Sequence, residues 1–158
     1  GDALDWLVLS GTVVRCSLVG QIESPLEAFV NPSSFKIYQA DTGLLVSKAG
    51  AQRADILAGI GGTFMGALTE NYVAQQLSAI GYPLHYWTRD NRAEIDFVVE
   101  RQGCVSAIEV KAGENTRSRS LSSLKKSHPG VRLIRLSTKP FGMNDGLRSI
   151  PLYAAFCL

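Results

Sequence analysis

The sequence predicts a mixed α/β (α+β) fold in which one sheet lies between helices. Its 158 residues are 46% hydrophobic and 19% charged, which is typical of a globular domain and excludes a disordered chain. No apolar run approaches the roughly 18 residues that a membrane helix needs. From Phe64 onward the patterns run helix, three strands, helix and strand, an order typical of a mixed sheet flanked by helices.

The first fifty residues predict a helix, two short strands and a second helix. An apolar run over 3–10 predicts a helix that ends at Gly11. Residues 12–19 are rich in β-forming side chains and residues 35–38 alternate between apolar and polar, so each range predicts a strand. Asp41 is the expected N-cap of the short helix that follows.

The rest of the chain predicts the main part of the sheet. A helical segment covers 64–80 and ends at Gly81, which suits the left-handed turn after a helix. The predicted elements after it are strands at 84–88, 93–101 and 104–112, a polar helix at 118–127, a strand at 132–137, and one further strand or edge segment within 147–158. A glycine-rich stretch suggests a soft boundary at 50–62, between an attached segment (1–50) and a compact core (51–158).

Charge is distributed unevenly along the chain. Residues 1–80 carry four Lys and Arg against seven Asp and Glu, a net charge of −3. Residues 81–158 carry twelve against seven, a net charge of +5. A basic half of this kind indicates either a nucleic-acid partner or an ordinary solvated surface.

The three cysteines are far apart and have no metal-ligand spacing, which argues against a zinc ribbon or a disulfide scaffold. They are Cys16, Cys104 and Cys157. We expect them to be small buried side chains in a reducing compartment, the cytoplasm.

Gln102 and Gly103 join two predicted strands and suit a two-residue hairpin turn. With that turn, the numbers of paired residues sum to 205. One face of the hairpin then carries the apolar side chains of Ile95, Phe97, Val99, Ile108 and Val110. The other face carries Glu94, Asp96, Glu109 and Lys111.

The polar face of this hairpin is a candidate metal site. Asp96 is predicted to lie opposite Glu109, and opposed carboxylates repel each other unless a cation compensates. Hard divalent cations such as Mg²⁺ select oxygen ligands, and Lys111 could position a water or a phosphate beside them. Glu70 borders the apolar stripe of Val73, Leu77 and Ile80 on the helix 64–80, so it could add a third acid or lie on the surface. The alternative is an exposed polar face with ordinary ion pairs, and a three-residue turn would change the pairing.

Short stretches along nearly the whole chain resemble a known family in their order and spacing. They are 35–38, 41–45, 66–73, 86–87, 93–98, 108–113, 135–137 and 150–153. Glu70, Asp96 and the run Glu109-Val110-Lys111 resemble the E…D…ExK signature of the PD-(D/E)XK, or restriction-endonuclease-like, nuclease superfamily. More closely, the chain resembles a C-terminal domain of unknown function that follows an AAA-type P-loop ATPase module in bacterial and archaeal proteins.

The resemblance implies a restriction-endonuclease-like core of order αβββαβ, preceded by a small winged-helix-like segment that ends the ATPase part. It implies Asp96 and Glu109 as ligands of Mg²⁺ or Mn²⁺, Lys111 as the residue that orients the attacking water, and Glu70 as an acid that assists through water. Metal-assisted phosphodiester hydrolysis of DNA or RNA would follow. The chain has no GxxxxGK[ST] motif, so ATP and any ATPase-driven oligomer belong to the missing upstream module.

Basic residues in the same half could hold a nucleic-acid backbone near the acids. The candidates are Arg89, Arg92, Arg117 and Arg119. For Arg117 and Arg119, ordinary exposure to solvent at the start of a helix is an equally good explanation. Tyr86 and Trp87 fit a core strand better than a base-stacking role. The alternative function is a non-catalytic recognition or oligomerisation module of the ATPase.

Overall fold

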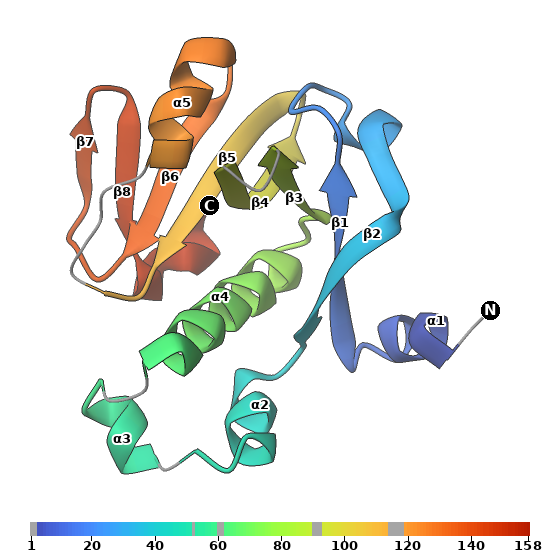
Figure 1. Cartoon of the computed structure of the whole chain (residues 1–158), viewed down its shortest axis with the longest axis vertical. Helices are drawn as coiled ribbons and strands as arrows, with labels where there is room; N and C mark the ends of the chain where they lie inside the picture. Colours follow the sequence, from blue (N-terminus) through green and yellow to red (C-terminus); the bar gives the residue numbers. More distant parts are fainter. Residues whose placement is uncertain (1–2, 52, 60–61, 90–92, 114–118) are drawn as a thin grey trace.

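The computed structural model describes the whole chain except residues 1–2, 52, 60–61, 90–92 and 114–118. The described residues form a single mixed sheet of eight strands in the order β2-β1-β3-β4-β5-β6-β8-β7 (Figure 1). The predicted mixed α/β class is therefore confirmed. None of the described helices is both long enough and apolar enough to cross a membrane.

The strands and helices mostly coincide with the predicted ranges. The strands are β1 (Val13–Val19), β2 (Val30–Gln39), β3 (Leu84–Arg89), β4 (Ala93–Arg101), β5 (Cys104–Lys111), β6 (Arg132–Ser137), β7 (Gly142–Asn144) and β8 (Leu147–Pro151). The helices are α1 (Ala3–Leu9), α2 (Thr42–Lys48), α3 (Arg53–Leu57), α4 (Gly62–Ala79) and α5 (Arg119–Ser127), with short 3₁₀ helices η1 (Leu26–Phe29) and η2 (Leu152–Cys157). As predicted, Asp41 caps α2, because its side chain accepts a hydrogen bond from Leu44 N at 3.0 Å.

Two hydrophobic cores lie on opposite faces of the sheet. Leu77 of α4 packs in one core with Phe97, and Leu124 of α5 packs in the other with Val98. Because successive side chains of a strand point to opposite faces, the neighbours Phe97 and Val98 belong to different cores. We call these two sides the α4 face and the α5 face.

The strand predicted at 35–38 is part of a longer one. β2 runs from Val30 to Gln39 and therefore includes part of the Pro- and Ser-containing stretch before it. It lies at the edge of the sheet, where Pro32 can be tolerated because one side of the strand needs no N–H donor. β1 pairs antiparallel with β2 and parallel with β3, so strands from both sides of the predicted boundary at 50–62 share one sheet.

The cysteine prediction was wrong for two of the three residues. Cys16 is fully buried on β1, but Cys104 and Cys157 are exposed. Cys104 follows the hairpin turn at the start of β5, and Cys157 is the last residue of η2; neither side chain belongs to a hydrophobic core.

The predicted hairpin register is confirmed near the turn. Pairs from Phe97–Ile108 to Arg101–Cys104 form as expected, and Gln102 and Gly103 both have positive φ, +53° and +73°. The paired part ends at Phe97 and Ile108, so Asp96 does not pair with Glu109 along this ladder, contrary to the prediction.

A β-bulge explains why the prediction fails beyond Phe97. On its other side β4 pairs with β3, and the register shifts by one residue between His85–Val98 and Trp87–Ile95. A bulge of this kind resets the alternation of side chains. Ile95 accordingly packs in the α5-face core, whereas Phe97 packs in the α4-face core, so the predicted apolar face is split between the two sides.

Replacing Gly103 by Ala should lower the free energy of unfolding by about 1 kcal/mol. The cost is conformational, because φ is +73° and nothing else lies within 4 Å of the added Cβ. Gln102→Asn is the matched control, since Asn tolerates positive φ and should raise stability slightly. Urea unfolding midpoints measure both, and equal midpoints for Gly103→Ala and the parent would contradict the turn geometry.

Candidate functional site

Helix α4 is fixed against the end of β2 by Asn71, whose side chain is almost fully buried. Asn71 Oδ1 accepts a hydrogen bond from Gln39 N at 2.8 Å, and Asn71 Nδ2 donates to Gln39 O and to Thr42 Oγ1, both at 3.1 Å. This bidentate contact with the backbone sets the position of the helix relative to the strand. It brings the preceding residue of the helix, Glu70, to the α4 face beside two side chains of β2.

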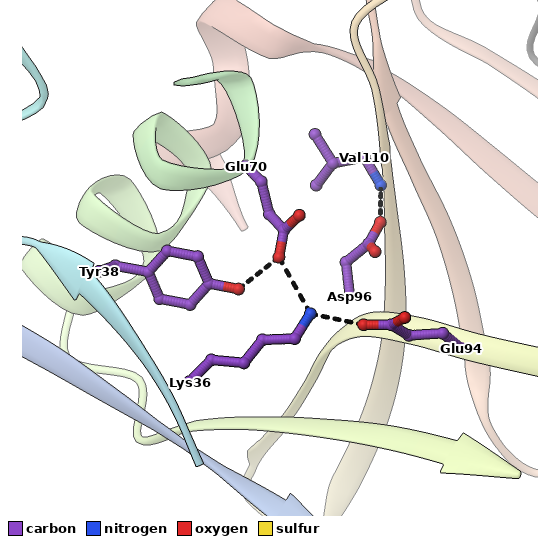
Figure 2. Close-up of polar contacts among 6 residues, drawn as sticks. All are labelled: Lys36, Tyr38, Glu70, Glu94, Asp96 and Val110. Atoms are coloured by element: carbon purple, nitrogen blue, oxygen red, sulfur yellow. Dashed lines mark hydrogen bonds and ion pairs between the residues drawn. The ribbon is translucent and has the colours of Figure 1, made fainter. Parts of the chain in front are cut away.

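Lys36, Tyr38, Glu70 and Glu94 form a polar cluster that we call the Lys36 cluster (Figure 2). Lys36 Nζ lies 2.5 Å from Glu94 Oε1 and 3.2 Å from Glu70 Oε1. The Tyr38 hydroxyl donates a hydrogen bond to the same Glu70 oxygen. The predicted sum of 205 places Glu94 opposite Lys111. Glu94 instead pairs with Lys36, because the bulge turns this end of β4 toward α4.

The proton affinities of this cluster follow from its burial and its charges. Burial alone lowers the pKa of Lys36, but the hydrogen bond with Glu94 and the charge of Glu70 outweigh it, so the pKa lies above its usual value. Burial and the neighbouring Glu70 carboxylate raise the pKa of Tyr38 well above its usual range. Lys36 is thus a permanent cation, and Tyr38 a permanent hydrogen-bond donor, around Glu70.

Asp96 lies in the bulge, next to this cluster. Its Oδ2 accepts a hydrogen bond from Val110 N at 2.7 Å, and Figure 2 shows Glu70 and Glu94 around it. Burial raises the pKa of Asp96 to about 7, with contributions from the charges of Glu70 and Glu109. The Val110 N–H and Lys36 act in the opposite direction without restoring the usual value.

Glu109 and Lys111 form an ion pair on the neighbouring strand. Lys111 Nζ lies 3.0 Å from Glu109 Oε1. Glu109 is only 5% exposed, and its other oxygen, Oε2, is buried without a hydrogen-bond partner among the described residues. A buried charged oxygen without a partner is costly, so this atom is suited to accept a ligand.

The structure therefore gathers the predicted acids, although not in the predicted way. Asp96 feels the charges of both Glu70 on α4 and Glu109 on β5, so it stands between the Lys36 cluster and the Glu109–Lys111 pair. No three His, Cys, Asp or Glu side chains among the described residues gather as a ready-made metal centre. Of the predicted metal ligands, Asp96 and Glu109 each keep a carboxylate oxygen without a hydrogen-bond partner among the described residues.

Sequence reasoning missed Lys36 and Tyr38 as site residues. Both lie on β2, more than thirty residues before Glu70, and the signal that could have found them is the alternation of 35–38. In that run Lys36 and Tyr38 point to one side of the strand, and a Lys on a side that also carries a core Tyr needs an acidic partner.

The predicted nucleic-acid residues are only partly described. Arg89 is exposed, and its guanidinium lies 5.5 Å from the centre of the Trp87 ring. Arg92 and Arg117 lie outside the described residues, and of Arg119 only the backbone, at the start of α5, is described. Trp87 is buried and Tyr86 packs against the α4-face core, so the prediction of a core role for these aromatics is confirmed.

Comparison with known proteins identifies the family. A family model described as a domain of unknown function, DUF4143, matches residues 65–155, which is more than half of the chain. This chain belongs to the DUF4143 family. The match fits the resemblance to a C-terminal domain of unknown function and spans four predicted site residues. They are Glu70, Asp96, Glu109 and Lys111.

Two curated relatives of this DUF4143 chain are uncharacterized proteins of mycobacteria. They are Mb2031c of Mycobacterium bovis and Rv2008c of Mycobacterium tuberculosis, each 36% identical over 124 residues. The match covers 73% of this chain and 27% of each relative, so the chain spans about a quarter of their length. No solved structure matches the chain significantly.

Proposed function

We propose that this DUF4143 chain is a metal-dependent nuclease domain of the PD-(D/E)XK, restriction-endonuclease-like class, which hydrolyses phosphodiester bonds in DNA or RNA. The observation that carries the proposal is the position of Asp96, held by Val110 N and crowded by the charges of Glu70 and Glu109. A buried carboxyl group whose pKa is raised by burial and by neighbouring charges, as for Asp96, is typical of functional sites. The element order from α4 to β6, which is helix, three strands, helix and strand, also supports this class.

The residues present fit a hard divalent cation such as Mg²⁺ or Mn²⁺. Glu109 Oε2 is buried and has no partner, and Asp96 makes no hydrogen bond or ion pair in the described structure other than the one with Val110 N. Both carboxylates thus retain oxygen atoms of the kind that these cations prefer. Bound there, the cation would lower the pKa of a coordinated water and offset the negative charge that develops on the phosphate.

The side chains around the acids have distinct proposed roles. Lys111, held 3.0 Å from Glu109 and one-third exposed, would donate a hydrogen bond to the attacking water or to a phosphate oxygen. Glu70 would accept a proton or a hydrogen bond from water on the other side of Asp96. Tyr38 and Lys36 would keep the Glu70 carboxylate in one orientation through their hydrogen bonds to Oε1.

Replacing Glu109 by Gln should lower Mn²⁺-dependent cleavage at least about tenfold, because it removes a ligand charge while conserving shape. Linear, single-stranded and branched DNA and RNA are the substrates for this assay. The matched control is Glu23→Gln, which makes the same change at an exposed acid outside the site. The parent should also gain thermal stability in Mn²⁺, and Glu109→Gln should lose this gain. If the parent neither cleaves nor gains stability, the nuclease proposal is wrong.

A non-catalytic recognition or oligomerisation module is the second candidate. The observation that favours it is the Lys36 cluster, in which an internal cation already pairs with both Glu70 and Glu94. In either case we propose that the chain is a domain of a longer AAA-type ATPase. The length of the curated relatives, of which the chain covers 27%, leaves room for an upstream module that binds ATP.

A further inference from the structure

A row of three side chains crosses the parallel strands on the α5 face. Glu109 of β5 is the register partner of Arg135 of β6, and Arg135 is the partner of Ser149 of β8. Partners in a parallel sheet point to the same face and lie about 4.8 Å apart. The row therefore extends the candidate site from Glu109 toward β8.

The last two members of the row line a hollow of about 730 Å³ beside α5. Other polar residues of its lining are Ser122, Ser123, Lys125, Lys126, Asn144 and Asp145. Among the described residues of this lining, three cations against one acid give a net charge of +2. Asp145 already forms an ion pair, because its carboxylate lies 2.5 Å from Lys125 Nζ. The remaining positive charge, on Lys126 and Arg135, is not balanced by any other described residue of the hollow.

Arg135 is the member of the row whose bonding is incomplete. Its Nε is buried without a hydrogen-bond partner in the described part of the chain, and the guanidinium makes no ion pair with Glu109, although the two residues are neighbours across the strands. Glu109 pairs with Lys111 instead. A buried donor without an acceptor is costly, and guanidinium groups bind phosphate oxygens through paired N–H donors.

We propose that this hollow binds a phosphate group of a nucleic-acid backbone. Arg135 is its main ligand, with Lys126 and Ser149 beside it. A phosphate supplies the acceptor that Arg135 Nε lacks and balances the charge of the lining. A hydrophobic ligand would leave both unsatisfied.

The proposal deepens the nuclease function and rests on it for the identity of the ligand. Because Arg135 adjoins Glu109 on the next strand, the phosphate in the hollow is a neighbour of the one that is cut. Binding there would fix the path of the nucleic acid across the ends of β5, β6 and β8. Arg135 is thus a positioning residue.

Binding of a fluorescent oligonucleotide, single-stranded or duplex, in EDTA tests the hollow without any catalysis. Arg135→Ala should weaken binding about tenfold by removing a charge-assisted contact. It should also reduce the slope of log affinity against log salt by about 0.7 to 0.9, the value for one lost phosphate contact. Arg135→Lys keeps the charge and should recover the slope but only part of the affinity.

Arg148→Ala is the matched control, because Arg148 precedes Ser149 on β8, pairs with Ile134 and lies on the other face of the sheet. It removes the same charge and should change affinity little. Melting curves of all variants establish that they fold. Equal binding by Arg135→Ala and the parent, or an equal loss in Arg148→Ala, would overturn the hollow as a phosphate site.

The two proposals fail separately. If the parent cleaves in Mn²⁺ but Arg135→Ala binds the oligonucleotide normally, the nuclease proposal stands and the hollow takes no part in binding. If the parent does not cleave but its metal-free binding depends on Arg135, the nuclease proposal fails. The hollow is then a phosphate site of a recognition module. A parent that binds no oligonucleotide overturns the hollow whatever the cleavage assay gives.

Discussion

Replacing Asp96 by Asn should reduce Mn²⁺-dependent cleavage by about 100-fold or more, the scale on which charged groups at a reacting centre contribute. Asn is the same size as Asp, and its side-chain oxygen can still accept the hydrogen bond from Val110 N that measures 2.7 Å in the parent. The variant therefore loses the charge and keeps the local structure. Single-turnover cleavage rates at saturating Mn²⁺ measure the effect.

The same substitution should make the metal-free protein more stable at pH 8. The pKa of Asp96 rises from an ordinary value of 3.8 to about 7 on folding, so the folded protein binds the proton more tightly than the unfolded chain. The contribution of Asp96 to stability is then largest below pH 4 and is lost as the pH rises through the folded pKa. With 1.36 kcal/mol per pKa unit, the loss is up to about 4 kcal/mol. Asn cannot ionise and escapes this loss.

Urea unfolding at pH 4, 6 and 8 in EDTA separates this effect from catalysis. The contribution of Asp96, seen as the difference between parent and variant, should appear as the pH rises through this interval. Asp55→Asn, at an exposed acid on α3, is the matched control and should leave the pH profile unchanged. A variant less stable than the parent at pH 8 would show that the Asp96 charge is already balanced in the metal-free protein.

Replacing Lys36 by Met should lower the free energy of unfolding by about 2 kcal/mol. Removal of one partner from a buried ion pair costs more than this, but the Lys36 and Glu70 side chains are 28% and 26% exposed, so solvent screens part of the effect. The variant leaves Glu70 and Glu94 without their cation, close to Asp96. Chemical denaturation at pH 7 measures the change.

The double variant Lys36→Met with Glu70→Gln should be more stable than the sum of the single changes predicts. This follows because the second substitution removes a charge that the first one leaves unbalanced. Lys139→Met, at an exposed Lys with no ion pair among the described residues, is the control and should have little effect. Additive losses in the double variant would contradict the coupling of Lys36 with Glu70.

The sequence contained enough information for most elements and for the turn of the hairpin. Gln102 and Gly103 defined a two-residue turn, so the pairs from Phe97–Ile108 to Arg101–Cys104 could be numbered in advance. The bulge could not be predicted, because it arises from the pairing of β4 with β3 on its other side. Periodicity along one strand carries no information about its neighbour. The error therefore began at Asp96, where the strand meets the site.

Contacts between segments that are distant in the sequence could likewise not be predicted from local sequence patterns. Lys36 and Tyr38 meet Glu70 only because Asn71 holds α4 against the end of β2, an arrangement of tertiary packing. The acids themselves could be selected from the sequence, since few charges lie within such apolar strands. The alternation of 35–38 marks Lys36 as a side chain in need of an acidic partner, but it does not say which acids, because they lie in a different part of the chain.

The position of β2 at the margin of the sheet has a consequence for motion. β2 is hydrogen-bonded to one strand only, β1, and strands of this kind open at lower free energy than central ones. Lys36 and Tyr38 both lie on it, whereas Asp96 and Glu109 lie on central strands. Amide hydrogen exchange along β2 would therefore report how often the carboxylates lose their internal cation. The electrostatic state of the site would fluctuate with the fraying of one edge.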